Sequence, residues 1–137
     1  MTTPETLSWL RALALWLVII GVEIVHGAAR LRWLVPAVGW ERSNQIGVPV
    51  GAALVLVVAT LGARWLGLRS TRSLLAVGAL WVAMLLAFEF SFGPLVLGQS
   101  VESIVASFLP WRGGWMAFGL VAMLLAPWIG ARWRGLR

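Results

Sequence analysis

Four apolar runs, each close to 20 residues long, constrain the fold of this 137-residue chain more than any other feature. A helix of about 20 residues crosses the ~30 Å hydrocarbon core of a bilayer. Because lipid offers no hydrogen bonds, each run must satisfy its own backbone groups, and a helix does so. The composition agrees, since 61% of the residues are hydrophobic and only 12% are charged. Soluble domains are about a quarter charged, so the sequence predicts a multipass membrane protein.

The predicted fold is a single all-α domain over residues 1–137, with four transmembrane helices in an up-down bundle. We expect the spans at about 7–28, 46–66, 73–92 and 114–131. The connector between the first two spans, Leu31 to Gln45, carries Trp33 and Trp40, which are typical of the membrane interface. At its end, Ser43 or Asn44 is expected to cap the second span.

A fifth, shorter helix is predicted between the third and fourth spans, at about 100–109. Its apolar residues recur at helical spacing, with polar residues on the opposite face. The apolar set is Val101, Ile104, Val105, Phe108 and Leu109, and the polar set is Glu102, Ser103 and Ser107. This pattern predicts an amphipathic helix lying in the interface, between helices 3 and 4.

The arginines predict the orientation of the bundle, because basic residues accumulate on the cytoplasmic side of membrane proteins. With four spans, the two termini and the second loop lie on the same side of the membrane. That side carries seven arginines, Arg11, Arg64, Arg69, Arg72, Arg132, Arg134 and Arg137. The other side carries four, Arg30, Arg32, Arg42 and Arg112. The excess predicts that both termini are cytoplasmic.

Residue usage excludes several classes of function. The chain has no Cys, Lys or Asp, so disulfides, thiolate catalysis, Schiff-base chemistry and a Ser-His-Asp triad are excluded. Its charged residues are Arg and Glu alone, a bias that favours a GC-rich bacterial genome and hence the bacterial inner membrane. We expect no cofactor and no nucleic-acid partner, because the arginines flank apolar runs instead of forming a soluble basic face. Those at one end are expected to contact the bilayer and its anionic lipids, namely Arg64, Arg69, Arg72, Arg132, Arg134 and Arg137.

Ionisable residues interrupt the apolar runs near one end. Glu23, His26 and Arg30 recur at intervals of three and four, so a helix places them on one side. At 1.5 Å per residue, Glu23 lies about 24 Å along the first span and Glu89 about 22 Å along the third. Both spans run outward, so the two carboxylates reach the same level. With residues at the ends of the other spans, they form a predicted intramembrane polar cluster of Glu23, His26, Arg30, Asn44, Gln45, Glu89 and Arg112.

Small residues at four-residue spacing predict where helices approach closely. Such stripes occur on the second, third and fourth spans. They are Gly47 and Gly51; Ala79, Ala83 and Ala87; and Ala122, Ala126 and Gly130. The stripes are expected to close the bundle internally, or alternatively to join two copies of the chain.

Metal binding is one chemistry open to the polar cluster, with Glu23, His26 and Glu89 as candidate ligands. Di-iron bundles use two Glu-x-x-His motifs and two further glutamates, whereas this chain has one histidine. A site within one copy would therefore be poor in ligands.

Proton-coupled transport is a second alternative, because carboxylate–histidine pairs serve as proton relays in transporters. A small four-helix protein with a membrane-embedded Glu on its first helix resembles in plan the small multidrug-resistance exporters. Glu23 lies nearer the outer end, however, and the loops are longer. On this alternative the chain is a small-solute transporter that acts as a dimer.

A membrane-embedded lipid-modifying enzyme is a third alternative. His26 would act as the base, Glu23 or Glu89 would orient it, and Ser91 or a headgroup hydroxyl would be the acceptor. The chain contains no nucleophile motif, which argues against catalysis.

The interpretation that requires the least special chemistry is a binding or accessory protein. The ionisable groups then neutralise one another and fix the register of the helices. We therefore predict a small multipass protein whose outer cluster engages a cation, a proton or a lipid headgroup. Its expected partners are the bilayer, a second copy of the chain or another membrane protein.

Overall fold

The structure, a computed structural model, describes residues 4–98, 100–109 and 115–135, and every regular element in these residues is a helix. Four stretches are long and apolar enough to cross a membrane, at Ser8–Val38, Trp40–Leu66, Thr71–Val96 and Met116–Trp133. The prediction of an all-helical chain with four helices able to span a membrane is therefore confirmed.

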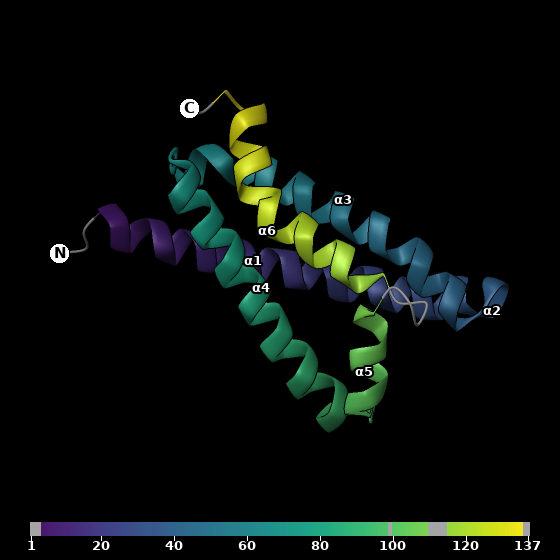
Figure 1. The fold of residues 1–137 in the computed structure, drawn as a ribbon. Coiled ribbons are helices and arrows are strands. Elements are labelled where there is room, and N and C mark those ends of the chain that lie inside the picture. Colours follow the sequence, from purple (N-terminus) through teal and green to yellow (C-terminus); the bar gives the residue numbers. More distant parts are fainter. Residues whose placement is uncertain (1–3, 99, 110–114, 136–137) are drawn as a thin grey trace.

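The elements follow one another with few intervening residues (Figure 1). Helix α1 covers Pro4–Ala29 and continues as a π-helix, η1, at Arg30–Leu34, and as α2 at Val35–Val38. Helix α3 covers Trp40–Leu66, and α4 covers Thr71–Phe92 and continues as a second π-helix, η2, at Gly93–Leu97. Helix α5 covers Val101–Phe108, and α6 covers Met116–Trp133.

The connector predicted between the first two spans is helical almost throughout, which differs from our expectation. Gly39 alone separates α2 from α3, and its φ of 90° is one that residues other than glycine rarely adopt. The chain therefore turns at one residue. As a result α3 begins at Trp40, no side chain caps it, and Ser43 lies inside the helix instead of at its start.

Helix α6 packs against both α3 and α4, and α1 packs mainly on α3. The face that α3 buries repeats every fourth residue, at Ser43, Gly47, Gly51, Val55, Ala59 and Ala63. Small residues on this face allow a close approach, which matters because lipid gives helices no hydrophobic drive to associate. At Gly130 of α6, for example, a Cβ would lie 2.9 Å from the backbone carbon of Ala59.

The small-residue stripe predicted on α4 is not buried against a neighbouring helix. Ala79, Ala83 and Ala87 are exposed, and α4 instead meets α6 through Gly78, which lies directly against the backbone of Leu124. The stripe on α6 packs inside the bundle as expected at Ala126 and Gly130, both of which are buried.

Polar contacts join three helix ends at one end of the molecule. Arg11 of α1 donates to the carbonyl of Trp65 at 2.7 Å, and Arg64 of α3 donates to that of Arg134 at 3.4 Å. At the opposite end α4 diverges from α3, and α5 lies between the end of α4 and the start of α6 (Figure 1).

Candidate functional site

The candidate site lies on the inner face of α1. In the first half of this helix the buried residues are Ala12, Leu15 and Ile19, which recur at intervals of three and four. The same spacing continues through Glu23, His26 and Arg30, and these three residues are referred to below as the triplet. One helix face is thus apolar in its first half and ionisable in its second.

The triplet faces two glycines of α3. A Cβ on Gly51 would lie 3.0 Å from Oε2 of Glu23. A Cβ on Gly47 would lie 2.9 Å from Nη1 of Arg30 and 3.7 Å from Cε1 of His26. The glycines predicted as a helix-packing stripe therefore provide the space that the ionisable side chains occupy.

Within the triplet, Nδ1 of His26 lies 3.5 Å from Oε2 of Glu23. The two side chains are only 19% and 24% exposed, respectively. In a helix that crosses a membrane, charged groups of this kind occur where they are paired or functional.

Three buried polar atoms at this end have no hydrogen-bond partner among the described residues. They are Oε1 of Glu23, Nε of Arg30 and Oγ of Ser43. Ser43 is fully buried and lies one turn from Gly47 on the same face of α3. Buried polar groups are almost always hydrogen bonded, so three of them mark a place where a polar ligand or water would be stabilised.

Arg30 lies within electrostatic range of the third span as well as of Glu23. Its charge interacts with the carboxylates of both Glu23 and Glu89. Arg30 is the first residue of the π-helix η1, and its Cζ lies 5.8 Å from the ring centre of Trp40. Single π-helical turns are frequent at functional sites.

Glu89 belongs to the last turn of α4 and is partly buried. Aromatic pairs surround its position in the sequence, with Phe88 stacked on Phe92 at 5.0 Å between ring centres. Phe90 stacks on Phe108 of α5 at 6.4 Å and so connects this end of α4 to the short helix.

The other predicted members of the cluster have different outcomes. Asn44 and Gln45 are partly buried on α3, on which Gly47 and Gly51 lie against the triplet. Arg112 lies outside the described residues. Ser43 was not predicted as a site residue, although its four-residue spacing to Gly47 was a signal for it. Ser91, the predicted acceptor, is exposed.

Metal binding receives no support from this arrangement. The described residues hold no group of three or more His, Cys, Asp or Glu that could bind a metal ion. The feature of the site that does carry chemistry is its charge, because Arg30 lies within electrostatic range of two carboxylates and His26 lies beside one of them, Glu23.

Comparison with known proteins gives no further assignment, since no protein family, no characterised protein and no solved structure matches the chain.

Proposed function

We propose that this chain is a small inner-membrane protein of the binding or accessory type, in which the triplet and Glu89 bind a proton or another small cation. The observation that carries this proposal is the excess of carboxylates. Glu23 and Glu89 both lie within electrostatic range of Arg30, and the imidazole of His26 lies beside Glu23.

Charge balance gives the cluster its affinity for a cation. Among the described members of the cluster, with His26 neutral, two carboxylates and one guanidinium leave one uncompensated negative charge. An isolated charge is expensive in a medium of low dielectric constant, so the cluster gains free energy when one positive charge joins it. A proton on His26 or on a carboxyl group supplies that charge, and so does a bound monovalent cation.

The unpartnered buried atoms support the same proposal. Oε1 of Glu23 and Oγ of Ser43 are oxygen atoms, which accept hydrogen bonds and coordinate hard cations. The glycines opposite the triplet keep the helix backbones close while leaving room for these side chains.

The orientation that fits this function is an up-down bundle in the bacterial inner membrane, with both termini cytoplasmic and the cluster toward the outer side. Hydrogen bonds between the start of α1, the end of α3 and the end of α6 support the alternating directions. Helix α5 would lie in the outer interface. Its Ile104 is buried against the protein, whereas Val101 and Val105 are exposed and would contact lipid.

The alternative function is a proton-coupled transporter that acts as a dimer, and one observation favours it. Ala79 and Ala83 remain exposed on α4 and line an apolar groove of about 330 Å³ beside α6. A second copy would pack its own small residues there. The groove is lined by Ala, Val and Leu alone, so it offers no polar group that would pass a charge along the seam.

Proton counting tests the proposal. Purified protein in nanodiscs is titrated from pH 8 to pH 5.5, and the protons bound per chain are counted with an indicator dye. Glu23→Gln and Glu89→Gln should each bind about one proton fewer than wild type, because one carboxylate fewer leaves the cluster neutral without protonation. The matched control is Glu41→Gln, since Glu41 is exposed and lies outside the triplet.

Two results decide the outcome. The titration is repeated in sodium, potassium and choline chloride. Release of the bound proton by sodium or potassium, but not by choline, would identify the ligand as a monovalent cation that exchanges with a proton. Equal proton counts for wild type, Glu23→Gln and Glu89→Gln would overturn the proposal.

A further inference from the structure

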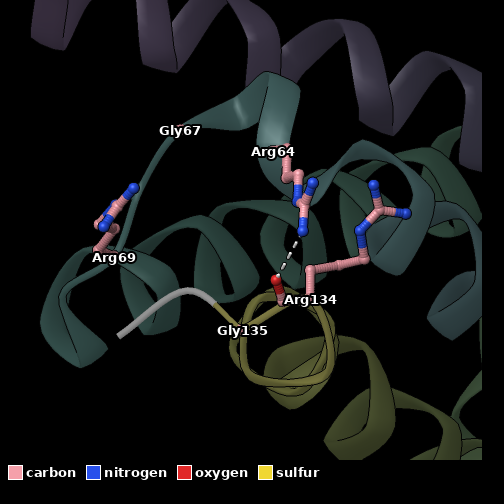
Figure 2. A pocket seen from close by; sticks show the side chains of 5 residues that line it. All are labelled: Arg64, Gly67, Arg69, Arg134 and Gly135. Carbon is pink, nitrogen blue, oxygen red and sulfur yellow. Dashed lines mark hydrogen bonds between the residues drawn. The ribbon is translucent and has the colours of Figure 1, made fainter.

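A basic hollow lies at the opposite end of the molecule from the triplet. It encloses about 420 Å³ between the end of α3 and the end of α6 (Figure 2). Three arginines and two glycines line it: Arg64, Gly67, Arg69, Arg134 and Gly135. This hollow is referred to below as the basic hollow.

Two glycines keep the basic hollow open. Gly67 follows α3 and Gly135 follows α6, each with a φ of 76°, which glycine adopts without strain. A Cβ on Gly135 would have no atom within 4 Å. The turns after both helices therefore each contain a residue without a side chain, which leaves space between them.

The three arginines that line this space make it positively charged. Nη2 of Arg64 donates to the backbone carbonyl of Arg134 at 3.4 Å, which holds Arg64 across the opening. Figure 2 shows the Arg64 side chain between those of Arg69 and Arg134.

Four of the five glutamates lie away from this end of the molecule, and the fifth, Glu5, belongs to the first turn of α1. Glu23 and Glu41 belong to the opposite ends of α1 and α3, Glu89 to the last turn of α4, and Glu102 to α5. An anion in the basic hollow would relieve the repulsion among the arginines.

Arginine is the side chain best suited to a phosphate, because its planar fork binds two oxygen atoms at once. We propose that the basic hollow binds the phosphate group of an anionic ligand. This site is separate from the triplet and Glu89 and does not depend on the proposed function.

The level of the basic hollow favours a lipid headgroup as the source of the phosphate. Trp65 and Trp133, both on helix turns next to it, are exposed, as amphipathic rings are at the height of the headgroups. Two further arginines lie over tryptophan rings at this end. Cζ of Arg11 lies 5.3 Å from the ring centre of Trp65, and Cζ of Arg132 lies 5.7 Å from that of Trp128.

Lipid competition tests this inference. The full-length protein is equilibrated in mixed micelles of phosphatidylglycerol and phosphatidylcholine with matched acyl chains, and the bound lipids are counted by native mass spectrometry. Wild type should retain phosphatidylglycerol preferentially. Arg64→Gln, Arg69→Gln and Arg134→Gln should each lower that preference about fivefold, the effect of about one basic residue at a membrane surface.

Controls separate a defined site from a general effect of charge. Arg32→Gln removes an exposed arginine at the other end and should leave the preference unchanged. Arg64→Lys keeps the charge but loses the fork, so it should bind phosphatidylglycerol less well than wild type. Arg69 is exposed on the turn after α3, so Arg69→Gln tests the site even if Arg64→Gln impairs folding.

A separate arm identifies the source of the phosphate. Inorganic phosphate is added to protein in phosphatidylcholine nanodiscs, and binding is followed by ³¹P NMR. Binding of phosphatidylglycerol without binding of inorganic phosphate supports a lipid site. Binding of inorganic phosphate alone would overturn the lipid assignment. Equal lipid preference in wild type, Arg64→Gln and Arg69→Gln would overturn the inference altogether.

Discussion

The glycines of this chain serve two different purposes, which are distinguished by what a methyl group would meet. At Gly47 and Gly51 it would meet the ends of charged side chains. At Gly78 and Gly130 it would meet the backbone of another helix. The first pair leaves room for the candidate site, and the second pair allows α6 to pack closely between α3 and α4.

This difference predicts unequal effects of Gly→Ala substitutions. Gly78→Ala should lower the free energy of unfolding by about 1–3 kcal/mol, the usual cost of overpacking. The reason is that the added methyl group would meet the Leu124 backbone, which cannot move aside as a flexible side chain can. Gly51→Ala should cost less, since the flexible Glu23 side chain can shift, but it should change proton binding. Unfolding in mixed detergent micelles measures the first effect, and the dye titration measures the second.

Gly21→Ala is the matched control, because a Cβ at Gly21 would have nothing within 4 Å. It should be neutral or stabilising by up to about 1 kcal/mol, the gain in helix propensity from Gly to Ala. A Gly78→Ala variant as stable as Gly21→Ala would show that α4 and α6 do not approach as closely as described.

At the residue scale, the sequence revealed one side of the candidate site better than the other. Glu23, His26 and Arg30 were predictable because ionisable residues at helical spacing stand out in an apolar run. The facing residues were not, since a glycine that leaves space looks the same in sequence as one that allows packing. Ser43 was predicted to cap the second span. In the structure the chain turns at the single residue Gly39, so α3 begins earlier and Ser43 lies inside it.

At the element scale, a hydrogen bond from Trp81 joins the third span to the first. It is fully buried, and its Nε1 donates to the carbonyl of Ala12 at 2.9 Å. Trp81→Phe should therefore destabilise the protein by about 1 kcal/mol, since hydrogen bonds between membrane helices average roughly 0.6 kcal/mol and a smaller ring packs less well. Reversible unfolding in sodium dodecyl sulfate measures the change.

Trp16→Phe provides the comparison on α1. Nε1 of Trp16 is buried without a hydrogen-bond partner among the described residues, so its removal relieves an unsatisfied donor. This variant should be less destabilising than Trp81→Phe. The reverse order would contradict the assigned role of Trp81.

The elements themselves were predictable to different degrees for physical reasons. Length and hydropathy suffice to find four helices able to cross a membrane, because the bilayer imposes both. They do not settle how a helix is rotated about its axis. The alanine stripe of α4 is exposed for this reason, and Gly78 lies against the backbone of α6 instead.

At the scale of the whole molecule, charge is divided between the two ends. The triplet and Glu89 occupy one end, whereas the basic hollow occupies the other. This asymmetry was visible in the sequence as arginines flanking alternate apolar runs. It is the basis for expecting the basic hollow in the cytoplasmic leaflet and the triplet toward the outer surface.

The absence of cysteine makes this orientation directly testable, because one introduced thiol is the sole labelling site. Ala37→Cys places it on exposed α2, near the triplet end, and Arg72→Cys places it on the exposed first turn of α4. A membrane-impermeant maleimide added to spheroplasts should label Ala37→Cys at once and Arg72→Cys after permeabilisation. Removal of Arg72 still leaves an excess of arginines on the expected cytoplasmic side. Immediate labelling of Arg72→Cys, with Ala37→Cys protected, would show that the orientation is the reverse and that the triplet lies toward the cytoplasm.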